Sequence, residues 1–115
     1  MKKSKIEFEV TLDQNEVPEK ISWKASDNPA GDAPAVTKSV SISLWDHLQK
    51  NTLRIDLWTK DMPVDEMKRF YIDVIGGLAQ SALTATGDEF MSAEMNALCD
   101  KLVEHLKKLE MGGST

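Results

Sequence analysis

The fold of this chain is decided at residues 52–67, a stretch that runs Thr52-Leu53-Arg54-Ile55-Asp56-Leu57-Trp58-Thr59-Lys60-Asp61-Met62-Pro63-Val64-Asp65-Glu66-Met67. In its first half, apolar residues take every second position, which is the period of a β-strand with one buried face. In its second half, Pro63 and the acidic residues around it mark the first turn of a helix. Proline is tolerated there, and negative charge favours the positive end of the helix dipole. We therefore predict that a β half ends here and a helical half begins.

Three segments upstream of this stretch show the same alternation and are predicted to be strands. They are Lys5 to Leu12, Ile21 to Ser26 and Val36 to Trp45. A polar segment with Pro18 connects the first two, and Asp46 to Asn51 is the predicted turn before the strand at residues 52–58. Between the two hairpins, Asp27 to Ala35 is rich in proline, glycine and aspartate, so we expect a mobile surface loop there.

The apolar positions also predict how these strands pair, because a slip of one residue would turn every apolar side chain to the other face. In the second hairpin, the matched pairs are Leu44 with Leu53, Ile42 with Ile55 and Val40 with Leu57. In the first hairpin, the expected pairs are Leu12 with Ile21, Val10 with Trp23 and Glu9 with Lys24. Both hairpins thus place their apolar residues on one side.

Two amphipathic helices are predicted in the second half of the chain. The first runs to about Thr84, and its apolar stripe consists of Met67, Phe70, Val74, Ile75, Leu78 and Ala82. The second has Ser92 as its expected N-cap and ends before Gly112-Gly113. Its apolar stripe consists of Met95, Leu98, Cys99, Leu102, Val103, Leu106 and Leu109.

These elements predict an α+β fold in two layers, with the order ββββαα. A four-stranded antiparallel sheet would be covered on one face by both C-terminal helices. A chain of 115 residues has room for one hydrophobic core, so we predict a single domain over residues 1–111 and a flexible C-terminal tail over residues 112–115.

Composition excludes several classes of function. Fourteen basic and 19 acidic residues give a net charge of -5, without the basic stripe that nucleic acid requires. No apolar stretch approaches the ~20 residues that span a bilayer, and the basic N-terminus lacks the apolar core of a signal peptide. Cys99 is the one cysteine in the sequence, which fits a reducing compartment. We expect a cytoplasmic protein that binds no nucleic acid and has no membrane span.

The sequence offers no set of residues for catalysis or for binding a metal or cofactor. His47 and His105 lie on a turn and a helix that need not meet, and Cys99 lies on an apolar helix stripe, as a buried thiol does. Gly76-Gly77 falls inside a helix without the lysine of a phosphate loop, so close helix packing explains it better. We therefore expect no catalytic residues, no metal, no cofactor and no enzymatic activity.

The candidate binding surface is the polar face of the second hairpin. Alternation places Trp45 and Trp58 on that face together with Arg54 and Asp56. Tryptophan is enriched at the hot spots of protein interfaces, and a polar surround is typical of them. The alternative is that the chain's own loop or N-terminal segment covers one or both tryptophans. We predict that Trp45, Trp58, Arg54 and Asp56 bind a protein.

The sequence resembles the gliding motility protein family GldC of Bacteroidetes. The resemblance is carried by Ser43-Leu44-Trp45-Asp46-His47 and residues 52–67, by the opening hairpin with Val17-Pro18-Glu19-Lys20-Ile21, and by Met91-Ser92-Ala93 and Cys99-Asp100 in the last helix. It implies an accessory protein for movement over surfaces, linked to the machinery of type IX secretion. It implies no enzyme activity and no catalytic residues.

Two functions of different kinds agree with these observations. The first is an adaptor that binds a protein component of the gliding machinery. The second is an oligomeric chaperone for unfolded or secreted proteins, because the ββββαα order is similar at fold level to the export chaperone SecB. An adaptor should capture one or two partners, whereas a chaperone should hold many. The sequence leaves the partner, the strand order and the homo-oligomeric state open.

Overall fold

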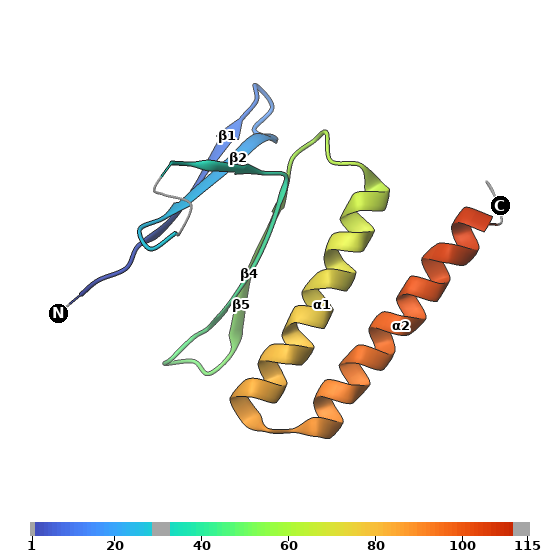
Figure 1. Ribbon diagram of the computed structural model, residues 1–115. Coiled ribbons are helices and arrows are strands. Elements are labelled where there is room, and N and C mark those ends of the chain that lie inside the picture. The colour runs from blue at the N-terminus through green and yellow to red at the C-terminus, as the bar shows by residue number, and fades with distance from the viewer. Residues whose placement is uncertain (1, 29–32, 112–115) are drawn as a thin grey trace. The chain divides into compact units, whose positions relative to one another are not determined.

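The computed structural model describes residues 2–28 and 33–111 of the chain. The chain divides into two compact units, Met1–Pro63 and Val64–Thr115. The elements, labelled in Figure 1, are β1 (Ile6–Leu12), β2 (Pro18–Ala25), β3 (Ala35–Thr37), β4 (Ser39–Trp45), β5 (Thr52–Trp58), α1 (Val64–Thr86) and α2 (Glu89–Met111). The predicted α+β class, with antiparallel strands followed by two C-terminal helices, is confirmed.

Some predictions concern residues that the structure does not describe. The expected tail at residues 112–115 lies outside the described residues, and so do residues 29–32 of the loop Asp27 to Ala35. The single domain over residues 1–111 and the packing of both helices on one sheet face stay predictions.

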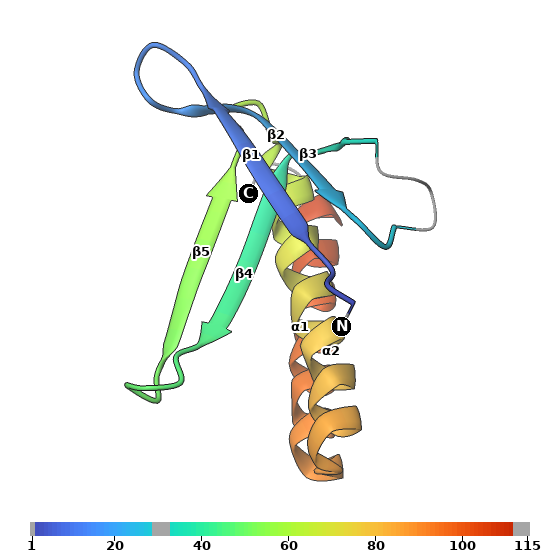
Figure 2. The ribbon, with the colours of Figure 1, turned by 90° about the vertical axis from the view of Figure 1, so that its left-hand side faces the viewer.

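The predicted four-stranded sheet is wrong, because the strands form two sheets. One sheet has three strands in the order β1-β2-β3, and the other consists of β4 and β5 (Figure 2). The expected strand from Val36 to Trp45 is interrupted by a bend at Lys38, after which the chain leaves β2 and pairs with β5. At the bend, Thr37 Oγ1 donates to the carbonyl of Ser39 over 3.1 Å, and the backbone N–H of Thr59 donates to the carbonyl of Lys38 over 2.9 Å. Side-chain alternation continues through such a bend, so the sequence pattern does not reveal it.

The register of the first hairpin differs from the prediction by two residues. Val10 lies opposite Ile21, Glu7 lies opposite Lys24, and the pairing shifts between Thr11 and Leu12. The turn explains the difference, because Asp13 Oδ1 accepts the backbone N–H groups of Asn15 at 2.8 Å and Val17 at 3.0 Å. This tight turn starts β2 at Pro18 instead of Ile21. Lys24 therefore forms its ion pair with Glu7, at 3.4 Å, and not with Glu9.

The register of the second hairpin is confirmed at every predicted pair. Leu44 lies opposite Leu53, Ile42 opposite Ile55 and Val40 opposite Leu57. Its turn is closed by Asp46, whose backbone N–H donates to the carbonyl of Asn51 over 2.8 Å and whose carboxylate accepts the N–H of Gln49 at 2.6 Å. Lys50 has a φ of 54°, the left-handed conformation that such a turn requires.

The two sheets are joined within the first unit by the segment that follows β5. The backbone N–H of Lys60 donates to the carbonyl of Pro18 over 3.0 Å, and its ammonium group lies 3.0 Å from Asp13 and 3.6 Å from Glu19. This segment thereby fixes the end of β5 against the first hairpin. The buried centre of the unit is Ile21 of β2, which is 0% exposed.

The second unit is an antiparallel helical hairpin whose loop is capped on both sides. The N–H of Gly87, which has a φ of 73°, donates to the carbonyl of Leu83 over 2.9 Å and ends α1. Asp88 caps α2, because its Oδ1 accepts the N–H of Met91 at 3.0 Å. The predicted N-cap Ser92 is therefore wrong. It is a buried residue of the helix, and its Oγ donates to the carbonyl of Ala79 over 2.9 Å.

The two helices meet along a line of small residues. Ala79 is 0% exposed, Cys99 Sγ lies 3.6 Å from the carbonyl oxygen of Ile72, and a Cβ on Gly76 would lie 3.9 Å from the same sulfur. A Cβ on Gly77 would meet nothing within 4 Å, so the expected close packing is found at only one of the two glycines. The predicted stripe of α1 omitted Ile72 and Ala79, which contact α2.

Candidate functional site

The polar face of the β4–β5 hairpin consists of four cross-strand pairs in register. In order along the hairpin they are Trp45 with Thr52, Ser43 with Arg54, Ser41 with Asp56 and Ser39 with Trp58. Successive side chains of a strand alternate between faces, so these residues share the side opposite the apolar pairs. All four predicted site residues therefore lie on one face of one hairpin, which Figure 2 shows as an elongated two-stranded ribbon.

Arg54 is at the centre of this face and is oriented by three neighbours. Its guanidinium group forms an ion pair with Asp56 over 2.8 Å, using two nitrogens on the two carboxylate oxygens, and donates to Ser41 Oγ over 2.6 Å. It also donates to Ser43 Oγ. Four polar side chains thus form one connected strip. Such a bidentate pair holds the arginine in a fixed orientation before any partner arrives.

The same contacts determine the protonation of the carboxyl group. Hydrogen bonds from Arg54, and then from Ser41, hold the pKa of Asp56 below its ordinary value, and burial acts in the opposite direction. Asp56 is therefore an anion near neutral pH. The strip is neutral overall, because one guanidinium faces one carboxylate, and this offers little to a phosphate backbone.

The two tryptophans lie at opposite ends of the strip, on different strands. Trp45 is 66% exposed and Trp58 is 46% exposed. The alternative that the loop Asp27 to Ala35 covers them involves residues 29–32, which lie outside the described residues. The two pairs that contain them lie six steps apart along each strand, which corresponds to about 20 Å. They do not form one aromatic cluster. A partner that contacts both must extend along the hairpin.

The hairpin also offers backbone hydrogen-bonding groups. The sheet contains only β4 and β5 among the described residues, so each strand has one edge without a neighbouring strand. Unpaired N–H and C=O groups of an edge can accept an added strand from another chain. An extended segment of a partner protein can therefore pair with an edge while its side chains reach the tryptophans.

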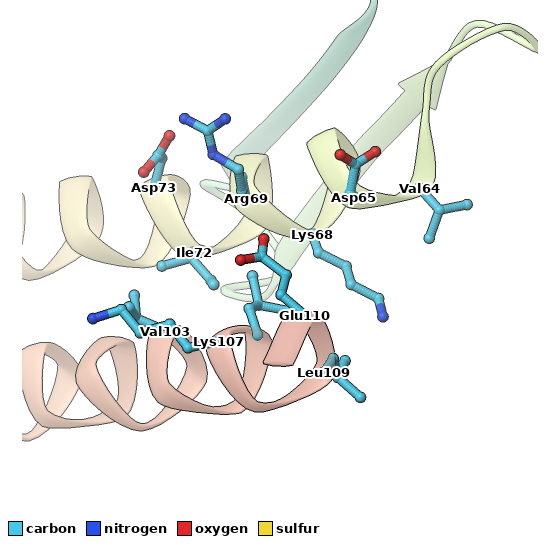
Figure 3. A pocket seen from close by; sticks show the side chains of 11 residues that line it. Val64, Asp65, Lys68, Arg69, Ile72, Asp73, Val103, Lys107, Leu109 and Glu110 are labelled. Carbon is cyan, nitrogen blue, oxygen red and sulfur yellow. The ribbon is translucent and has the colours of Figure 1, made fainter. Parts of the chain in front are cut away.

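A cleft in the helical hairpin was missed by sequence reasoning. It has a volume of about 640 Å³ and lies where the start of α1 faces the end of α2. Figure 3 shows Ile72 directed toward α2 and Glu110 directed toward α1, while Arg69 and Asp73 point away from α2. Its walls also include Val64, Asp65, Lys68, Val103, Leu106, Lys107 and Leu109. The lining combines acidic, basic and apolar side chains.

Two further searches concern metals and membranes. Within residues 2–28 and 33–111, no three His, Cys, Asp or Glu side chains gather closely enough to hold a metal ion. Over the same residues, neither helix is long and apolar enough to cross a bilayer.

The comparison with protein families gives a result that agrees with the residues already described. Searches of curated proteins and of solved structures found no match for the chain. The family model described as "Gliding motility-associated protein GldC-like" matches residues 18–108, a range that begins with β2 and includes the whole β4–β5 hairpin. The match covers well over half of the chain, and the chain therefore belongs to the GldC-like family of gliding motility-associated proteins.

Proposed function

We propose that this GldC-like chain is a non-enzymatic, cytoplasmic adaptor that binds a protein component of the gliding machinery of Bacteroidetes, linked to type IX secretion. Family membership supports the connection with gliding motility. The adaptor role is supported by the polar face of the β4–β5 hairpin. That face consists of an oriented polar strip between two exposed tryptophans, an arrangement suited to binding and not to bond cleavage.

The observation that carries this proposal is the exposure of Trp45 and Trp58 on either side of the hydrogen-bonded strip. Large aromatic side chains at 66% and 46% exposure lose much water-accessible apolar surface when a partner covers them. Hydrogen bonds already fix the side chain of Arg54 in the strip between them. Binding of a partner therefore costs little additional side-chain entropy at Arg54. Aromatic anchors beside a preorganised arginine are typical of protein-binding hot spots.

The experiment is a pull-down from the native host with tagged wild-type protein and with the double variant Trp45→Ser/Trp58→Ser. Each truncated hot spot should cost ~2 kcal/mol of binding free energy, so capture should fall by more than tenfold. The fold should persist, because both side chains lie outside the core. Circular dichroism and the thermal midpoint measure that.

Val36→Ser is the matched control, because Val36 is 68% exposed on the other sheet. It should keep every partner. The proposal fails if the double variant folds and captures the same partners as the wild type. If the double variant unfolds, the tryptophans stabilise the chain itself and the hairpin face is not the binding surface.

The chaperone alternative is favoured by a separate observation on the same hairpin. On its apolar face, Leu44 is 50%, Leu53 is 51% and Ile55 is 45% exposed. Exposed apolar strands are the kind of surface that unfolded chains bind. Suppression of the aggregation of several unrelated proteins would favour the chaperone, whereas capture of one or two partners without such suppression favours the adaptor.

A further inference from the structure

Helix α2 carries an apolar stripe that lies beside the residues that contact α1. Its members follow the alternating spacing of four and three residues that marks a coiled-coil seam. The apolar members are Met91, Met95, Leu98, Leu102 and Leu109, and the polar residue His105 takes the remaining position of the repeat. Leu109 also lines the cleft beside α1. Met91 is 49% and Leu98 is 45% exposed, although both belong to the apolar stripe of an amphipathic helix.

The stripe faces one side of the helical hairpin. In α2, Met91 and Leu98 each precede by one residue a residue that contacts α1, namely Ser92 and Cys99. A step of one residue is a rotation of about 100°, so the stripe is turned away from the line of contact with α1. In α1, Tyr71 precedes Ile72 in the same way and is 38% exposed.

Because the helices are antiparallel, equal offsets from the contact line fall on the same face of the hairpin. Tyr71 of α1 and Leu98 of α2 therefore share one face, and both are partly exposed on it. A further helix that packed against this face beside α2 would cover the stripe, as helices do in a four-helix bundle.

Charged residues flank this stripe, and their order indicates which kind of helix can pack against it. Glu94, Lys101 and Lys108 follow one another at intervals of seven residues, so they form a row along one border of the stripe. The row is acidic toward the loop of the hairpin and basic toward its open end. Neither Glu94 nor Lys101 has an ion-pair partner among the described residues.

We propose that the occupant is a second copy of this chain, with its α2 antiparallel to the first and a twofold axis beside Leu98. In this arrangement, Leu98 of one copy lies close to Leu98 of the other, near the twofold axis. Glu94 of each copy faces Lys101 of the other. Both ion pairs form at once, because a twofold axis makes each contact twice. A parallel arrangement would put the two charged rows on opposite borders of the interface, so Glu94 of one copy would not face Lys101 of the other, and this pairing would be lost.

The first measurement is the molar mass of the full chain in solution by light scattering or sedimentation. The wild type should be a dimer that dissociates on dilution. Leu98→Asp should weaken association by at least tenfold, because it puts a charge at the twofold axis. Asn96→Asp, which introduces the same side chain on the opposite side of α2, should leave the dimer intact. A wild type that is monomeric at every concentration overturns the proposal.

Charge reversal tests the proposal without touching the apolar stripe. Glu94→Lys alone and Lys101→Glu alone should each weaken the dimer, because like charges then face each other. An equimolar mixture of the two variants should recover association, since opposite charges at positions 94 and 101 then face each other between one copy of each variant. Glu94 and Lys101 are two helical turns apart in one chain, so recovery in the mixture reports only contacts between chains.

The failing outcomes are distinct. If neither single variant weakens the dimer, or if the mixture recovers nothing, the α2 stripe does not pair with itself. If Leu98→Asp lowers the thermal midpoint strongly and both charge variants behave as the wild type, the chain's own residues cover the stripe. The proposal does not rest on the adaptor function, because the tryptophan variants leave α2 unchanged.

Discussion

The two sheets of the first unit share one apolar-polar alternation but differ in what it buries. In the sheet β1-β2-β3, Ile21 belongs to the central strand, with Val10 on one side and Thr37 on the other, and is 0% exposed. In the sheet β4–β5, Ile55 has a neighbour on one side only, Ile42, and is 45% exposed. Alternation reports which face a residue occupies, whereas burial depends also on the strands that flank the residue and on what covers its face.

This difference also separates the roles that the two sheets can play. The three-stranded sheet has the buried centre of its unit, so changes there should act on folding. Among the residues that the structure describes, the two-stranded sheet has two free edges, two exposed tryptophans and a half-exposed apolar face. A hairpin of two strands is marginal alone, and its exposed groups make it the better candidate for partner binding.

The largest expected effect is on the free energy of unfolding, and it is measured by comparing two separate variants, one isoleucine truncated in each sheet. Ile21→Ala should lower the free energy of unfolding by about 2–5 kcal/mol, as is typical of a fully buried isoleucine. Ile55→Ala should cost roughly half as much, because nearly half of its side chain stays in contact with water. Chemical denaturation of both variants measures the contrast. Equal losses would show that Ile55 is buried in solution, by a second copy or by other parts of the chain.

The fold could be predicted from the sequence wherever one local rule decides it. The register of β4 with β5 follows from apolar matching alone, since Asp46 closes the turn at the expected place. The first register is off by two residues because Asp13 bonds to the backbone of its own turn, a choice that apolar periodicity does not encode. The division into two sheets depends on the pairing of Ala35–Thr37 with β2 while the next residues pair with β5. Which strands pair is decided by contacts between distant segments, which the local sequence pattern does not contain.

The candidate site shows the same limit. Alternation placed Trp45, Arg54, Asp56 and Trp58 on one face, and the structure agrees. The ion pair of Arg54 with Asp56 could have been anticipated from two positions in one strand that share a face. The contact line of the helices was predicted less well. Its small residues, such as Gly76 and Ala79, contribute little apolar signal although they let the helices approach.

A second contrast lies in the two hairpin turns and should have a smaller effect. The carboxylate of Asp13 accepts two backbone N–H groups and the ammonium group of Lys60, whereas that of Asp46 accepts one backbone N–H. Asp13→Ala should therefore lower the thermal midpoint more than Asp46→Ala. Differential scanning calorimetry of both variants measures the order. The reverse order would indicate that Asp13 orders its turn without stabilising the fold.

The smallest expected effect is the loss of folding stability at low pH. Carboxyl groups on both hairpins contribute to it. Hydrogen bonding to Lys5 and Lys24 lowers the pKa of Glu7 from 4.5, and bonding to Val17 and Lys60 lowers that of Asp13 from 3.8.

On the second hairpin, bonding to Arg54 and Ser41 lowers the pKa of Asp56 from 3.8. A carboxyl group whose pKa is lower in the folded chain stabilises the fold above its unfolded pKa. That contribution disappears as the pH falls through the folded value. Stability should therefore hold near neutral pH and decline below about pH 4.

Single amide variants assign this decline to particular groups. Asp13→Asn and Asp56→Asn should each be less stable than the wild type near neutral pH, and each should lose less on acidification, since one titrating group is gone. The side chain of Asp56 is 31% exposed and that of Asp13 is 16% exposed, so added salt should shrink the difference more for Asp56→Asn than for Asp13→Asn. Thermal midpoints measured from about pH 6 to about pH 3 for the wild type and both variants test this. If Asp56→Asn shows the full acid loss of the wild type, its pair with Arg54 orients the strip between the tryptophans without contributing to stability. In that case, Arg54 would contribute to the binding of a partner and not to the stability of the fold.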